Sequence, residues 1–211
     1  MRIRYIAAVT VLLTALTFPS ATRADRGEFY TLLTIEPQLG WYTEPLAGRV
    51  SATNAGGGAA LTAYYGFTNS LHVGADLHLS AALNINFPDT TISLNGTPST
   101  GTVYANSTCI GANAVVVYRY DTGLSVAPLG RFEIGATSLG YTNIQYVPNG
   151  QSYVFNLPSS SELALELRGA LLAEYRFGNH IVASAGFAVT AHPGARAPWS
   201  VSVPVSIGWI W

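Results

Sequence analysis

Charged residues are scarce in this sequence of 211 residues, and lysine is missing altogether. Charged residues make up 10% of the chain, against roughly 25% in an ordinary soluble domain. The 10 basic residues are therefore all arginines, and they stand against 11 acidic residues. The lack of lysine argues against nucleic acid as a partner and against a polybasic patch on the membrane surface.

Long apolar runs are also missing after the N-terminus, although 49% of the residues are hydrophobic. No segment there approaches the ~20 consecutive apolar residues of a transmembrane helix. The single cysteine, Cys109, excludes an intramolecular disulfide, and we interpret it as a small buried residue. The high apolarity must therefore be distributed in some other way.

The N-terminus has the pattern of a secretory signal peptide, predicted to cover residues 1–24. Arg2 and Arg4 provide a positive start, residues 6–16 an apolar stretch, and Thr22-Arg23-Ala24 a cleavage site with small residues. Its removal leaves seven arginines against eleven acids, a net charge of −4 for residues 25–211.

From Glu28 onward, apolar and polar residues alternate with a period of two, which is the pattern of β-strands. In the last segment Trp199, Val201 and Val203 share one face, while Ser200 and Ser202 share the other. The sequence predicts an all-β protein of one domain, an antiparallel up-and-down barrel of eight strands. The predicted strands are residues 28–42, 59–67, 70–84, 109–120, 124–136, 162–177, 180–191 and 199–211.

Short and long connections alternate strictly between these segments. Short turns are predicted at residues 68–69, 121–123 and 178–179, where residues that tolerate turn dihedrals occur. The remaining connections are residues 43–58, 85–108, 137–161 and 192–198. Short turns on one side and longer loops on the other are typical of outer-membrane barrels.

Aromatic residues on the apolar face gather at the strand ends beside the short turns. Amphipathic rings favour the level of the lipid headgroups, so this pattern predicts an aromatic girdle at one membrane interface. Trp41 and Trp199 mark the opposite ends of their strands. The predicted girdle residues are Phe29, Tyr65, Phe67, Tyr118, Tyr120, Tyr175, Phe177, Trp209 and Trp211.

With its signal peptide, eight alternating segments and C-terminal pattern, the chain resembles the small outer-membrane β-barrel proteins of Gram-negative bacteria. Val205, Ile207, Trp209 and Trp211 lie at every second position up to the end, which is similar to the signal read by the barrel-assembly machinery. In that family the last residue is usually Phe, whereas here it is Trp. The resemblance implies a location in the outer membrane, contact with its lipid and lipopolysaccharide, and both termini in the periplasm.

In a soluble barrel such as a lipocalin, apolar and polar residues also alternate along each strand, but the apolar face points inward. Its solvent face would carry many lysines and glutamates, whereas the polar face here is mainly Ala, Gly, Ser and Thr. The apolar segments also have about the 9–11 residues needed to cross a bilayer. We therefore predict that the apolar face points outward to lipid.

Eight strands enclose an interior that side chains can just fill. Charges of both signs point inward, and we expect them to form ion pairs because lone charges in a lumen are costly. The predicted lumen network is Glu36, Asp76, Arg119, Arg131, Glu133, Glu166, Arg168, Glu174 and Arg176. A filled lumen indicates a role in envelope structure or in surface interaction through the external loops.

Two other functions stay open at this point. Pro37 and Pro204 lie in the first and last strands, where each removes a hydrogen-bond donor from the closing seam. A weak seam would suit a transporter that releases small apolar molecules sideways into the bilayer. Alternatively, the lumen could serve as a narrow channel. The oligomeric state is not defined by the sequence.

A lipid A-modifying enzyme is the least favoured function. Such barrels need a His/Ser pair and a carboxylate near the outer leaflet, but the lipid-facing residues include no histidine or acid. His72 and His78 share a strand face with Asp76, yet residues six apart on a strand are separated by ~20 Å, too far for one metal ion. We expect no catalytic residue, no metal and no cofactor.

Overall fold

The computed structural model of this chain describes residues 26–46, 50–94, 96–120, 122 and 126–211. The predicted signal peptide, residues 1–24, and most of the predicted turn at residues 121–123 lie outside these residues. No helix in the described part of the chain is long and apolar enough to cross a membrane.

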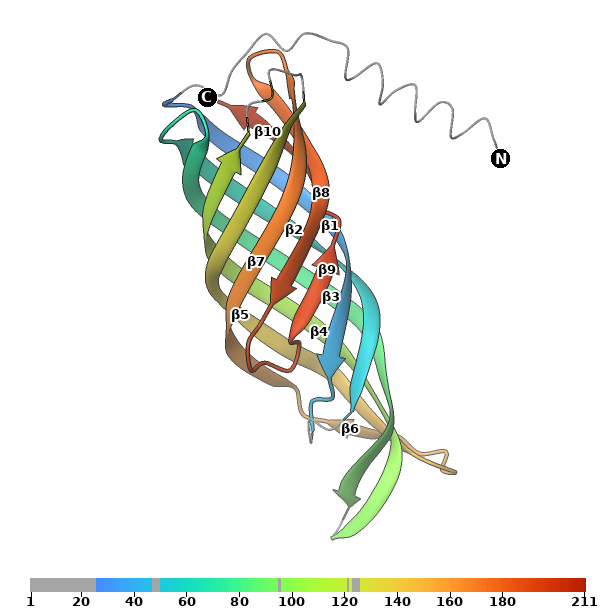
Figure 1. The fold of residues 1–211 in the computed structure, drawn as a ribbon. Helices are drawn as coiled ribbons and strands as arrows, with labels where there is room; N and C mark the ends of the chain where they lie inside the picture. The colour runs from blue at the N-terminus through green and yellow to red at the C-terminus, as the bar shows by residue number, and fades with distance from the viewer. Residues whose placement is uncertain (1–25, 47–49, 95, 121, 123–125) are drawn as a thin grey trace, which may run out of the picture.

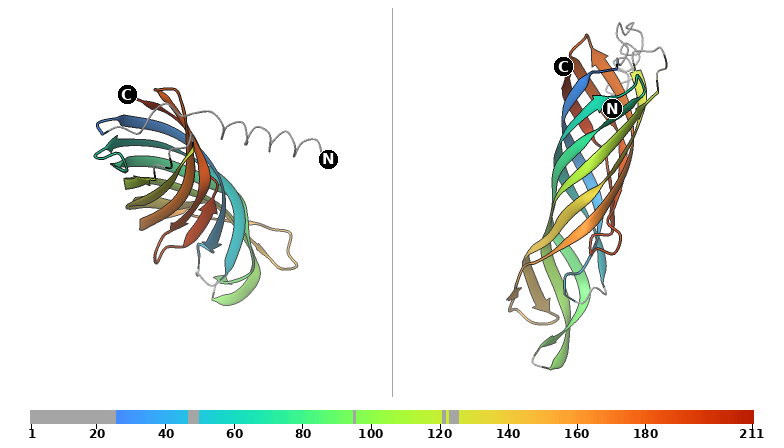
Figure 2. Two further views of the ribbon diagram at one scale, coloured as in Figure 1. Left: turned by 45° about the horizontal axis from the view of Figure 1, so that its top comes forward. Right: turned by 90° about the vertical axis from the view of Figure 1, so that its left-hand side faces the viewer.

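The described residues form a single antiparallel sheet that closes on itself (Figures 1 and 2). The last barrel strand is divided into β9 and β10, and β6 is a short addition that pairs with β5. Eight strands therefore surround the lumen, which confirms the predicted barrel. The strands are β1 (Phe29–Thr43), β2 (Ser51–Gly66), β3 (Leu71–Leu94), β4 (Thr97–Arg119), β5 (Val126–Pro148), β6 (Phe155–Leu157), β7 (Ser160–Phe177), β8 (Ile181–Ala191), β9 (Trp199–Ser202) and β10 (Val205–Ile210).

The barrel closes where β1 pairs with the two parts of the last strand. Residues 30–35 of β1 pair with β10, and residues 38–41 pair with β9. The interruption at Val203 and Pro204 lies opposite Pro37, and proline cannot donate to a ladder. The Val203 N–H still donates a hydrogen bond of 3.0 Å to the carbonyl of Pro37. The seam is thus paired on both sides of one irregular point.

Alternation along each strand sorts apolar residues to the outside and polar residues to the lumen. Leu33, Leu61 and Leu77 are neighbours in the registers of β1, β2 and β3, and their side chains are 56–60% exposed. Thr62 and Asp76 occupy the next positions, face inward and are buried. The outer surface is consequently a continuous apolar band.

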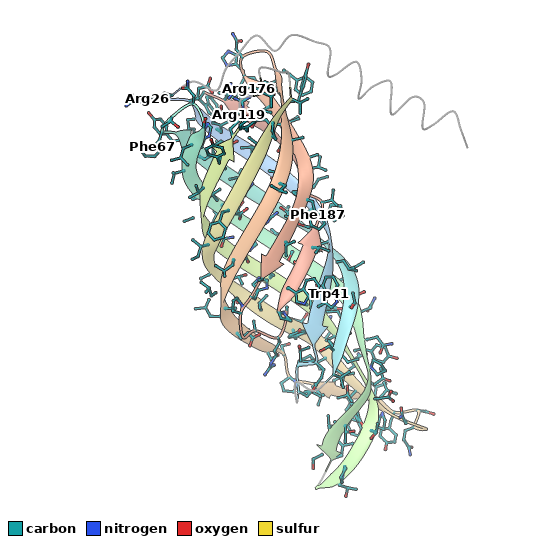
Figure 3. All side chains as sticks on the ribbon, in the orientation of Figure 1. Arg26, Trp41, Phe67, Arg119, Arg176 and Phe187 are labelled. Atoms are coloured by element: carbon teal, nitrogen blue, oxygen red, sulfur yellow. The ribbon has the colours of Figure 1, made fainter. Side chains whose placement is uncertain are left out.

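The two ends of the barrel differ. β1 begins and β10 ends at one end, called here the terminal end, where Phe67, Arg119 and Arg176 also lie (Figure 3). The opposite end, called the hairpin end, is marked by Trp41 and Trp199, whose rings stack with centroids 3.6 Å apart. The side chains predicted to form the girdle are outside the lumen and at least partly exposed near the terminal end: Phe29, Tyr65, Phe67, Tyr118, Tyr120, Tyr175, Phe177, Trp209 and Trp211.

The prediction of loops at residues 85–108 and 137–161 is largely wrong. β3 continues to Leu94, β4 begins at Thr97, and β5 continues to Pro148, so the sheet extends beyond the barrel (Figure 1). Register shifts interrupt the β3–β4 ladder after Ala82 and after Phe87. Such bulges insert an extra residue into one strand, and they break the period of two on which the sequence prediction relied.

We call residues 85–105 and 142–157 the hairpin-end extension. Its side chains share a buried apolar cluster with the hairpin end of the barrel, and in this cluster Ile85, Phe87, Val103, Ile144 and Tyr146 are almost completely inaccessible to solvent. Burial of large apolar side chains contributes about 1.5–3 kcal/mol each. The extension is therefore a folded part of the sheet whose apolar side chains pack onto the hairpin end of the barrel.

Candidate functional site

The centre of the lumen is filled by an ion-pair network that crosses between strands. Arg131 of β5 lies 2.9 Å from Asp76 and 2.7 Å from Glu133. Arg168 of β7 lies 3.7 Å from the same Glu133 oxygen and also pairs with Glu36. These charged side chains are almost fully removed from solvent, where an unpaired charge would be costly. Glu133 thus holds two arginines of neighbouring strands together.

Neutral polar groups add hydrogen bonds to this network, in which the Arg131–Glu133 and Arg168–Glu133 contacts are ion pairs without hydrogen-bond geometry. Thr62 donates to Asp76 at 2.8 Å, while the Asn113 amide donates to Glu166 at 2.7 Å and to Glu133 at 3.2 Å. Hydrogen bonds that satisfy the remaining lone pairs offset part of the desolvation cost of buried ions. The arrangement favours one fixed set of side-chain positions across the lumen.

A second group of ion pairs fills the lumen near the terminal end. Glu174 lies 3.3 Å from Arg119 and 3.6 Å from Arg176, and Arg176 lies 3.0 Å from Glu28. The Tyr30 hydroxyl donates to Glu28 at 2.6 Å. This group closes the lumen toward the end at which β1 begins.

The hairpin end is covered by the connection between β8 and β9, residues 192–198. The Arg196 guanidinium donates to the Pro45 carbonyl at 2.7 Å, and its backbone N–H donates to Glu162 at 2.7 Å. Ala197 is buried in the apolar cluster of this end. The connection therefore folds inward over the lumen, and His192, the first residue of the predicted connection 192–198, is only 6% exposed.

Between the central network and this cover lies a cavity of about 50 Å³, a volume on the scale of a few water molecules. Its lining includes His78 of β3, Cys109 of β4, Glu166 of β7 and His192. The Nε2 atoms of His78 and His192 lie 3.0 Å and 3.1 Å from the same Glu166 oxygen. Four side chains with acid–base or metal-binding atoms thus meet in one place.

The structure brings the predicted lumen charges together in these groups: Glu36, Asp76, Glu133, Arg131, Arg168 and Glu166 near the centre, and Arg119, Glu174 and Arg176 near the terminal end. Sequence reasoning missed Glu28, Asn113 and the meeting of His78 with Cys109 and His192. For His78 the sequence did hold a signal, because the alternation along its strand predicts that its side chain points into the lumen. No sequence signal places His192, because it belongs to a connection.

Val205, Ile207, Trp209 and Trp211, the predicted assembly signal, point outward along β10 and just beyond it. β10 is paired on both sides, with β1 and with β8. The C-terminal pattern therefore lies on the outer surface beside the seam.

The fold is that of the small outer-membrane β-barrels. Ail, the attachment invasion locus protein of Yersinia pestis, was solved in complex with the heparin analogue sucrose octasulfate; it is 13% identical with a TM-score of 0.50, and the match covers 88% of this chain and 99% of Ail. The Neisserial surface protein A is 13% identical with a TM-score of 0.51, covering 87% of this chain and 99% of that one.

A major outer membrane protein of Thermus thermophilus is similar in the same way. It is 14% identical with a TM-score of 0.52, and the match covers 86% of this chain and 99% of that chain. No protein-family model and no curated protein sequence matches this chain. The protein shares the fold of these bacterial outer-membrane barrels.

Proposed function

We propose that this protein is a non-enzymatic outer-membrane barrel that presents its hairpin-end extension outside the cell for interaction with another surface. The observation that carries the proposal is the folded extension itself. Three barrel strands continue past the lipid-facing band, and their apolar side chains are buried in a cluster shared with the hairpin end of the barrel, while ion pairs occupy the lumen below. The sheet is thus built to hold a surface away from the membrane.

The lengths of the connections support this orientation. Two turns at the terminal end are short: β2 and β3 are connected by residues 67–70, and β7 and β8 by residues 178–180. Short turns are periplasmic in outer-membrane barrels. The termini then face the periplasm, and the hairpin end faces outward. Lipid and lipopolysaccharide surround the apolar band under this proposal.

The chemistry of the extension indicates an uncharged partner. Asp89 is the only charged residue in residues 85–105 and 142–157, whereas Tyr104, Tyr153 and Val154 are 39–51% exposed. A sulfated ligand of the kind bound by Ail needs a basic surface, which these residues do not supply. Tyrosine rings together with Ser, Thr and Asn fit neutral glycans or other uncharged hydrogen-bonding surfaces.

Replacing Tyr104 and Tyr153 together by alanine is expected to abolish binding without unfolding the barrel, because both rings are exposed. We would measure retention of nanodisc-embedded protein on arrays of neutral and sulfated glycans. Wild type should bind neutral glycans with little dependence on salt, because screening acts on charges. Tyr120→Ala, an exposed tyrosine near the terminal end, is the matched control. Binding that survives the double substitution, or no binding by wild type, would overturn the proposal.

The filled lumen leads to a separate expectation about transport. In planar bilayers the wild-type barrel should give no steady conductance, because ion pairs fill the centre and the connection at residues 192–198 covers the hairpin end. Stable single-channel steps at neutral pH would instead favour the narrow-channel alternative.

A further inference from the structure

The cluster of His78, Cys109, Glu166 and His192 is not explained by presentation of a surface. The Cys109 sulfur lies 3.9 Å from His78 Nε2, and both histidine Nε2 atoms are close to one Glu166 oxygen. The ligand atoms of His78, Cys109 and Glu166 all lie within 4.8 Å of one another. In a tetrahedral zinc site the ligand atoms are about 3.3–3.8 Å apart, so these three residues are already close to this spacing, and His192 contacts the same Glu166 oxygen.

The outer nitrogens of both histidines are held by other groups. His78 Nδ1 lies 3.1 Å from Asp76, and His192 Nδ1 lies 2.8 Å from the Ala197 carbonyl. Metal-binding histidines are oriented in this way, with the second nitrogen donating to a carboxylate or a backbone carbonyl. In that tautomer each Nε2 points its lone pair at the Glu166 carboxylate. Lone pairs facing one another at about 3 Å require a cation or a proton between them.

We propose that His78, Cys109, Glu166 and His192 form a binding site for one borderline divalent metal ion, with Zn²⁺ as the best match. Thiolate and imidazole ligands select zinc over hard cations such as Mg²⁺ or Ca²⁺, which prefer oxygen ligands. One thiolate and one carboxylate also balance the two charges of the ion. A neutral site suits a lumen in which net charge is costly.

The residues around the four side chains leave space for a metal ion. A Cβ added at Gly111 would lie 2.6 Å from the ring of His78, so glycine at this position leaves space for the imidazole. The Thr137 hydroxyl lies 2.9 Å from the Cys109 sulfur and is a hydrogen-bond partner for a thiolate. The adjoining cavity, which the four side chains help to line, provides space for the ion and its exchange.

Titration of the refolded mature protein in detergent with Co²⁺ tests this site, because tetrahedral cobalt with a thiolate ligand has characteristic absorption. Wild type should bind one equivalent, show the sulfur-to-cobalt charge-transfer band, and lose both on addition of Zn²⁺. Cys109→Ser should abolish that band, and His192→Ala should weaken binding by more than about tenfold. His180→Gln, a histidine in the β7–β8 turn, is the control and should bind as wild type does.

Folding of each variant is checked by its heat-dependent gel mobility, and Cys109→Ser keeps nearly the size of the original side chain. Binding of cobalt without the sulfur band, or equal affinity in wild type and His192→Ala, would overturn the proposal. Absence of any binding by the folded wild type would show that the cluster is an ion-paired group of protonated histidines only. The glycan experiment above does not depend on these outcomes.

Discussion

Glu133→Leu is expected to lower the free energy of unfolding of the barrel by about 3–5 kcal/mol. Glu133 is fully buried and lies between Arg131 and Arg168, at 2.7 Å and 3.7 Å from their Nε atoms. Its removal leaves two guanidinium groups with fewer partners in a lumen that water reaches poorly. Loss of one partner of a buried pair costs more than the pair itself contributes, so the effect should be large.

Urea unfolding of the protein in lipid vesicles, followed by tryptophan fluorescence, measures this change. Asp89→Asn is the matched control, because Asp89 is exposed in the hairpin-end extension; surface charges contribute at most about 1 kcal/mol. A change for Glu133→Leu as small as that of the control would mean that water or rearranged side chains replace Glu133, and that the lumen is not a fixed network.

Leu77→Arg is expected to destabilise the barrel in a bilayer by about 2–4 kcal/mol, the cost of arginine on the lipid face at the midplane. Leu77 is 60% exposed on the outer face and lies midway along the barrel part of β3. Arginine in hydrocarbon must reach the headgroups or draw water inward. The same substitution on a solvent-facing surface would change little.

The matched control is Tyr104→Arg, which is exposed on the hairpin-end extension. We expect this substitution to change the free energy of unfolding by no more than about 0.5 kcal/mol relative to wild type, as for most surface substitutions. The measurement is again urea unfolding in vesicles, with both variants compared in bilayers of one composition. Equal effects of the two substitutions would place Leu77 outside the hydrocarbon and contradict the contact of the apolar outer face with lipid.

The barrel was predictable because its physical signal is local. Alternation, as in Trp199 to Val203, depends only on the strand period, and the glycine and asparagine at residues 178–179 mark a tight turn without reference to the rest of the chain. The extension was not predictable in this way. Asn84 and Asp89 adopt positive φ at the bulges, and the sequence around them has the composition of a turn.

The candidate site was likewise predictable only in part. Strand parity placed Glu133, Arg131 and Arg168 inside, but which arginine meets which carboxylate depends on the registers between strands. His72 and His78 lie on one strand, too far apart for one metal ion, so the sequence predicted no metal site. The proposed ligands instead come from three strands and a connection, and only the closed barrel brings them together.

The bulges in β3 also affect what a neighbouring molecule can do. β2 pairs with β3 only as far as Ala82, so the rest of β3 has an edge that no strand in the described part of the chain covers. An unpaired edge is a template for another chain. Here the shifts in the backbone divide this edge into two short regular runs, residues 85–87 and 90–94, which limits the length over which an added strand can pair in register. In the proposed orientation, this interrupted edge makes it harder for copies of the protein to join into a continuous sheet through β3.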